Sequence, residues 1–220
     1  MSHDNPVIDL FNFLIGNTGD YNRFGYSKYI SVVFYLCLLA GGLYVAVLNW
    51  SRDPEQRTGY HFWVAAMRMT AAGMWIQGTI WKLPLPVAAG FKYWLDQEAK
   101  FSSVPLLTTL MHSLFIPYIA LLQPVVYLVE IFFTISLTLG IAVRLSGIVA
   151  VLFTIQLWLG LYNDPTEWPW TYMAIICAHG MFAAACAGRS LGLDHLLRGR
   201  AELVPARSQP LLARVYALSS

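Results

Sequence analysis

Long apolar stretches, separated by short polar segments, dominate this chain. Five of them approach or exceed the roughly 20 mostly apolar residues with which an α-helix crosses a bilayer. They are Tyr29–Trp50, His61–Trp81, Pro117–Val143, Leu145–Asn163 and Trp168–Gly188. Because an open sheet leaves backbone groups unpaired in lipid, we expect helices and no strands. The pattern therefore predicts an all-α integral membrane protein with five transmembrane helices, whose first partner is the lipid bilayer.

Composition supports this class of protein and excludes several others. Of the 220 residues, 57% are hydrophobic and only 12% are charged, against about 25% charged residues in soluble domains. The formal net charge of +2 gives no broad surface for nucleic acid. Cys37, Cys177 and Cys186 form no CxxC pair, so we expect neither a disulfide scaffold nor a tetrathiolate zinc site. No metal or haem is expected, because histidines are neither clustered nor matched in depth.

The distribution of basic residues predicts an orientation. Eight of them would share one side of a five-helix protein: Arg52, Arg57, Arg144, Arg189, Arg198, Arg200, Arg207 and Arg214. Five would lie on the other side: Arg23, Lys28, Lys82, Lys92 and Lys100. Since Lys and Arg favour the cytoplasmic side, we expect the C-terminus inside and the N-terminus outside. Segment 1–28 lacks the pattern of a secretory signal, and Asp9–Ile15 is either a short interfacial helix or an anchored tail.

Three ionisable residues fall within the predicted membrane helices. Arg68, Glu130 and His179 lie ~15–21 Å from the same outer end at a rise of ~1.5 Å per residue. Because a charge inside the bilayer is costly, we expect Arg68 to pair with Glu130 and His179 to hydrogen-bond to either. Three interpretations of this candidate catalytic set remain open. It can be a structural staple between helices, the end of a substrate or quinone pocket, or part of a proton path.

Further polar residues lie nearer the outer surface, namely Gln77, Gln123, Tyr127 and Gln156. Pro124 interrupts the third apolar stretch, where a proline removes a backbone hydrogen bond. We predict that these four residues and His179 line one outward cleft whose donors suit a quinone head group. The alternative is that they satisfy backbone groups or one another.

Two basic residues at the helix ends each allow two interpretations. Lys82, beside Trp81, is either a snorkelling anchor or an anion contact for substrate at the mouth of the cleft. Arg144 is either an orientation charge of the inner loop or an anchor for a lipid head group.

Three segments resemble DoxX-type membrane proteins, particularly the DoxD branch, the small subunit of thiosulfate:quinone oxidoreductase. The first is RMTAAGMWIQGTIWKL, with Arg68, Gly73, Gly78 and Lys82. The second is Tyr127-Leu-Val-Glu130, followed by Gly140 and Arg144-Leu-Ser-Gly147. The third is Glu167-Trp-Pro-Trp170, followed by Gly188-Arg-Ser-Leu-Gly-Leu-Asp194. By matching position, the resemblance carries over Arg68, Lys82, Glu130, Arg144, Arg189 and Asp194.

The resemblance implies a four-helix core over residues 61–195, to which this chain adds segment 1–28, a helix over 29–50 and a tail over 196–220. It also implies a quinone-linked redox system of a prokaryotic cytoplasmic membrane that oxidises thiosulfate or thiols, with quinone as cofactor. The alternative is a non-catalytic accessory or assembly subunit of a larger respiratory or photosynthetic complex, with other membrane subunits as partners. A transporter is less favoured, because no inverted repeat is visible.

Overall fold

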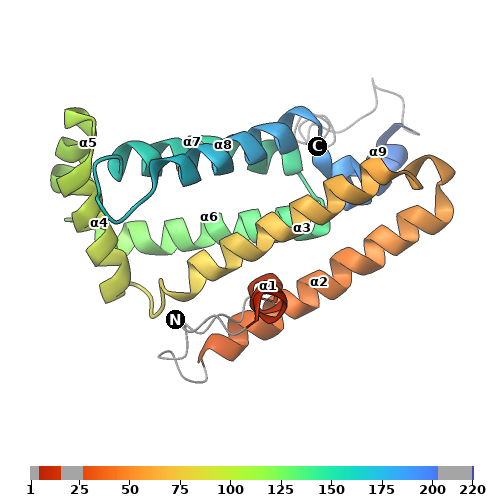
Figure 1. Ribbon diagram of the computed structural model, residues 1–220, viewed down its shortest axis with the longest axis horizontal. Helices are drawn as coiled ribbons and strands as arrows, with labels where there is room; N and C mark the ends of the chain where they lie inside the picture. Colours follow the sequence, from red (N-terminus) through yellow and green to blue (C-terminus); the bar gives the residue numbers. More distant parts are fainter. Residues whose placement is uncertain (1–4, 16–26, 203–219) are drawn as a thin grey trace.

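The computed structural model of the protein describes residues 5–15, 27–202 and 220 (Figure 1). Within these ranges the chain is helical and contains no strand. The helices are α1 (Pro6–Leu14), α2 (Ser27–Arg52), α3 (Gly59–Ile80), α4 (Ala89–Phe101), α5 (Pro105–Leu110), α6 (Ile119–Leu139), α7 (Val143–Gly160), α8 (Pro169–Ala184) and α9 (Leu193–Glu202). Shorter turns are η2 (Pro54–Gln56), the π-helical η3 (Met111–Phe115) and η4 (Ala187–Arg189).

The five predicted membrane helices correspond to α2, α3, α6, α7 and α8. Within the described ranges, three segments are long and apolar enough to cross a membrane, namely Tyr29–Arg52, Ile119–Leu139 and Val143–Gly160. Helix α8 has only 16 residues, whereas α3 has 22 but includes charged and amide side chains. The structure therefore supports an all-α membrane protein with three candidate spans. Helix α6 runs through Pro124 without ending there.

The long helices form layers, and two short helices cross one end (Figure 1). Helices α7 and α8 lie side by side, α3 and α6 pack as a second pair, and α2 lies against α3 and α6. Buried side chains from all five join one core, including Tyr35, Trp75, Phe133, Ala150 and Phe182. Helices α4 and α5 lie across the end opposite α9.

Helix α2 is an integral part of this core. Tyr35 is fully buried, and its hydroxyl donates to the Met69 carbonyl at 3.1 Å. A Cβ at Gly42 would lie 2.5 Å from the Thr138 carbonyl oxygen, so glycine permits the close approach of α2 to α6. At the other end of α2, Asn49 donates to the carbonyl of Gly192 at 2.9 Å.

The end of the bundle near α9 is held by a cluster that we call the Asp194 clamp, made of Arg68, Gly140, Ala142, Val143 and Asp194. The Asp194 carboxylate accepts the N–H groups of Ala142 at 2.8 Å and Val143 at 3.2 Å. The backbone N–H of Asp194 donates to the Gly140 carbonyl at 2.8 Å. Arg68 is fully buried, and the negative charge of Asp194 stabilises its guanidinium group. The clamp thus joins α3, the turn between α6 and α7, and the start of α9.

Within the N-terminal segment, Pro6–Leu14 forms a helix. The side chain of Asn5 caps α1 by accepting the Val7 N–H at 2.9 Å. Gln77 ties the helix to α3 by donating to the Phe13 carbonyl at 3.0 Å. Four apolar side chains of α1 are more than half exposed, namely Val7, Ile8, Leu10 and Phe11. This exposure fits an interfacial position, which stays a prediction.

Candidate functional site

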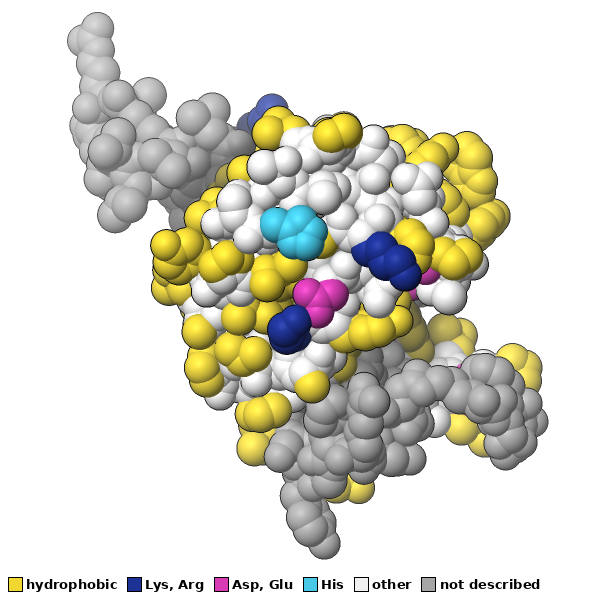
Figure 2. Space-filling model, turned by 90° about the vertical axis from the view of Figure 1, so that its left-hand side faces the viewer, with side chains coloured by type: hydrophobic (Ala, Val, Ile, Leu, Met, Phe, Trp, Pro, Cys, Tyr) yellow, Lys and Arg dark blue, Asp and Glu magenta, His cyan; other side chains and the backbone are white. Residues whose placement is uncertain are grey.

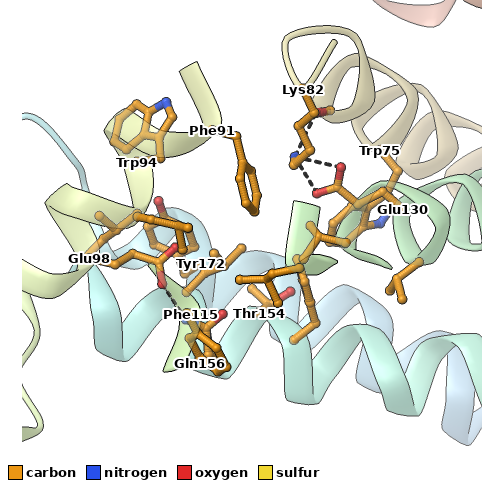
Figure 3. Close-up of a pocket in the computed structure, with 18 of the residues that line it drawn as sticks. Trp75, Lys82, Phe91, Trp94, Glu98, Phe115, Glu130, Thr154, Gln156 and Tyr172 are labelled. Atoms are coloured by element: carbon orange, nitrogen blue, oxygen red, sulfur yellow. Dashed lines mark hydrogen bonds and ion pairs between the residues drawn. The ribbon is translucent and has the colours of Figure 1, made fainter. Parts of the chain in front are cut away.

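A cavity of about 540 Å³ lies among the helices at the end crossed by α4 (Figure 3). Seven aromatic side chains line it: Trp75, Trp81, Phe91, Trp94, Phe115, Phe153 and Tyr172. The polar side chains in the lining are Lys82, Glu98, Glu130, Thr154, Gln156 and Glu167. The cavity is thus a largely apolar site with a few polar groups, as is common for sites that bind small molecules.

Helix α4 covers the cavity because its sequence is amphipathic. Phe91, Leu95 and Glu98 recur at helical spacing and are buried, so they share the inward face. On its outer side Lys92 and Asp96 form an exposed ion pair at 2.6 Å. Figure 2 shows this end of the molecule, where a few charged side chains lie among apolar ones.

Both ends of α4 are anchored to the bundle. After its last residue, the Ser103 N–H donates to the Leu159 carbonyl of α7 at 2.9 Å. Before its first residue, Gln123 of α6 accepts the Ala88 N–H at 2.8 Å and donates to the Lys82 carbonyl at 2.5 Å. Gln123 therefore holds the connection from α3 to α4 and does not line the cavity.

Replacing Gln123 by Leu should destabilise the cover of the cavity. The substitution leaves the Ala88 N–H and the Lys82 carbonyl without their buried partner, which typically costs about 1–3 kcal/mol. The temperature of unfolding in detergent should fall, and limited proteolysis between α3 and α4 should become faster. Gln77→Leu is the matched control, since Gln77 bonds α1 instead. Equal proteolysis of the connection in both variants would contradict this role for Gln123.

The inner wall of the cavity carries a buried ion pair between Lys82 and Glu130. The Lys82 ammonium lies 2.8 Å and 2.7 Å from the two carboxylate oxygens of Glu130. It also donates to the Gly78 carbonyl at 2.8 Å and lies over the Trp81 ring at 3.9 Å from its centroid. Lys82 is only 3% exposed, so it is neither a snorkelling anchor nor an open anion contact.

The prediction that Arg68 pairs with Glu130 is therefore wrong. Arg68 donates to the Leu137 carbonyl and belongs to the Asp194 clamp. Lys82 reaches Glu130 because its side chain turns back over the last turn of α3. Arg68 lies 14 residues earlier, or ~21 Å along the helix axis. The guanidinium group of Arg68 therefore lies near the Leu137 carbonyl and away from Glu130.

His179 has a different partner from the one expected. Its Nε2 accepts the indole N–H of Trp75 at 2.6 Å, so His179 bonds neither to Arg68 nor to Glu130 in this structure. Trp75 lines the cavity, whereas His179 does not. His179 can therefore influence the cavity by orienting the Trp75 ring.

The predicted quinone-binding set does not gather at one cavity. Of Gln77, Gln123, Tyr127, Gln156 and His179, only Gln156 contributes to the lining. Gln77 and Gln123 bond backbone groups of α1 and of the α3–α4 connection, as the alternative interpretation proposed. Tyr127 is half-buried outside the lining. Arg144, exposed at the clamp end, is compatible with either of its two interpretations.

Glu98 is a cavity residue that the sequence interpretation missed. Gln156 donates to its Oε2 atom, and glycine at position 160 leaves room, since a Cβ there would lie 3.0 Å from the same oxygen. Burial raises the pKa of Glu98 to about 7, although the Gln156 hydrogen bond and the charge of Lys82 act in the opposite direction. The helical spacing of Phe91, Leu95 and Glu98 in the sequence indicates that the three side chains share one face of a helix.

The charges around the cavity disfavour an anionic ligand. Lys82 is the only Lys or Arg among the described lining residues, and Glu130 already neutralises it. Two further carboxyl groups, Glu98 and Glu167, line the same space, and the Tyr172 hydroxyl donates to Glu167 at 3.0 Å. The arrangement favours a neutral, largely apolar ligand with hydrogen-bonding groups.

Comparisons of the chain with protein-family models, curated proteins and solved structures found no match.

Proposed function

We propose that this protein is a membrane-embedded quinone-binding subunit of a redox system. The observation that carries the proposal is the aromatic cavity with polar groups on two sides. Aromatic side chains suit the flat head group through stacking. Gln156 gives one amide N–H to Glu98, and its second amide N–H can donate to a carbonyl oxygen of the ligand. The volume of about 540 Å³ is within the range of small-molecule sites.

The DoxX resemblance supports a quinone as the ligand and thiosulfate or a thiol as the source of electrons. Reduction of a quinone to a quinol takes up two electrons and two protons. Lys82 is the one Lys or Arg among the described lining residues and is already paired with Glu130, so the lining offers no unpaired cation to an anion such as thiosulfate. We therefore propose that a partner subunit oxidises the donor and delivers the electrons, while this chain binds the quinone.

We further propose that α3 and α8 cross the membrane with the three candidate spans. Helix α3 packs against α2 and α6 with its polar groups largely buried, and α8 packs along α7. Such shielding lets helices of lower hydropathy cross a bilayer. The basic residues favour an inside C-terminus and an outside N-terminus in a prokaryotic cytoplasmic membrane.

Binding of a short-tail benzoquinone tests the proposed function. Decylubiquinone added to the detergent-solubilised protein should quench tryptophan fluorescence saturably, because three tryptophans line the cavity. Val129→Trp should weaken binding at least tenfold, since Val129 of α6 lines the cavity and a larger side chain fills it. Leu128→Trp is the matched control, because Leu128 is 63% exposed.

Thermal unfolding of both variants establishes that they are folded under the titration conditions. Quenching that does not saturate in the unchanged protein would contradict quinone binding. Equal affinities of the two variants would place the bound quinone outside this cavity.

A second candidate function is that of an accessory subunit. The outward side of α2 favours it, because Ile30, Val33, Tyr44 and Val47 are each more than half exposed. Such an apolar face can contact another membrane subunit as readily as lipid. Co-purification in mild detergent at fixed stoichiometry with other subunits would support this role, and migration of the protein alone would count against it.

A further inference from the structure

We propose that Glu98 binds the ligand of this cavity, its protonated carboxyl group donating a hydrogen bond to a carbonyl oxygen of that ligand. This inference rests on the proposed function, because the ligand that it concerns is the quinone. It gives α4 a role beyond covering the cavity and adds a ligand contact outside the three candidate spans.

The position of Glu98 supports this assignment. The side chain leaves the buried face of α4 and lies across the cavity from the Lys82–Glu130 pair (Figure 3). Gln156 donates to Oε2 and thereby orients the carboxyl group. Among the described residues no side chain or backbone group is hydrogen-bonded to Oε1. One carboxyl oxygen is thus held by the protein while the other remains available to a ligand.

The surroundings of Glu98 favour its protonated form. The ionisable groups that line the cavity with it are Lys82, Glu130, Glu167 and Tyr172. Lys82 is paired with Glu130, and Glu167 accepts a hydrogen bond from Tyr172. The positive charge of Lys82, which lowers the pKa of Glu98, is therefore shared with Glu130, while desolvation raises the pKa of Glu98 to about 7.

Protonation decides whether Glu98 attracts or repels a carbonyl group. A carboxylic acid donates one hydrogen bond, whereas a carboxylate only accepts and so repels a carbonyl oxygen. If the quinone binds the protonated form, its apparent dissociation constant rises as the protonated fraction falls. With a pKa of about 7, affinity should fall about tenfold between pH 6 and pH 8. Oxidised benzoquinone itself carries no group that titrates in this range.

Titrations of decylubiquinone at pH 6, 7 and 8 with the full chain in detergent test this assignment. The unchanged protein should lose about tenfold in affinity across the range. Glu98→Gln should keep the affinity of pH 6 at all three values to within about twofold, because its amide N–H donates without titrating. Asp96→Asn is the control on the same helix, since Asp96 is exposed in its pair with Lys92. This variant should retain the tenfold change.

Several results would overturn the assignment. One is binding by the unchanged protein that does not vary with pH, and another is a Glu98→Gln variant that retains the tenfold change. Both would leave quinone binding itself intact. Absence of saturable binding at every pH would instead contradict the proposed function, and this inference with it. Thermal unfolding at each pH identifies any change in affinity that arises from loss of folded protein.

Discussion

Replacement of Glu130 by Gln should lower the free energy of unfolding by about 3–5 kcal/mol. The substitution leaves the ammonium group of Lys82 buried without its countercharge, and the Gly78 carbonyl and the Trp81 ring that remain in contact with it are uncharged. Because Lys82 is 3% exposed, bulk water solvates the unpaired ammonium group poorly. Unfolding of the purified protein in detergent, induced by heat or by SDS, measures the loss.

A pair of double variants determines which cation belongs to Glu130. Lys82→Met combined with Glu130→Gln should recover much of the loss, since both buried charges are then removed. Arg68→Met combined with Glu130→Gln should instead show additive losses, because Arg68 belongs to the Asp194 clamp. Recovery by the Arg68 combination and not by the Lys82 combination would mean that the ion pair assigned here is incorrect.

Replacement of Asp194 by Ala should also destabilise the protein by about 3–5 kcal/mol. The N–H groups of Ala142 and Val143 lose their acceptor, and the buried guanidinium of Arg68 loses the charge that stabilises it. Asp194→Asn should have an intermediate effect, since it retains one side-chain oxygen as an acceptor. Unfolding in detergent again supplies the measurement.

The control for Asp194 is Asp96→Ala, which removes an exposed i,i+4 ion pair. Such pairs contribute only about 0.3–0.5 kcal/mol. Asp194→Ala should therefore be several times more destabilising than Asp96→Ala. Similar effects of the two substitutions would show that the clamp does not hold the turn between α6 and α7.

The helix pattern of the protein followed from local sequence features. Apolar stretches predicted the positions of all five long helices, because helix formation in such segments depends on residues close together in the chain. Helix α4 was not predicted, although Phe91, Leu95 and Glu98 have helical spacing. Its mixed composition lacks the long apolar run that marks the five longer helices.

Side-chain partners required the tertiary structure. Matching depths along straight helices brought Arg68 and Glu130 together in the prediction, but depth alone neglects the rotation of each helix. A long side chain also places its charge far from its Cα atom, as with the ammonium of Lys82 beside Glu130. Gln123 likewise looked like a ligand group, whereas the fold places it beside the Lys82 and Ala88 backbone.

By itself, the sequence determined the class of protein, the positions of its long helices and which polar residues lie within apolar segments. Only the tertiary structure decided that Glu130 pairs with Lys82, that Arg68 donates to the Leu137 carbonyl, and that Glu98 lies in the cavity. The physical reason is the range of the interactions. The hydropathy of a segment depends on residues that are close together in the sequence. Ion pairs and cavities instead depend on the rotation of each helix about its axis and on the angles at which several helices cross.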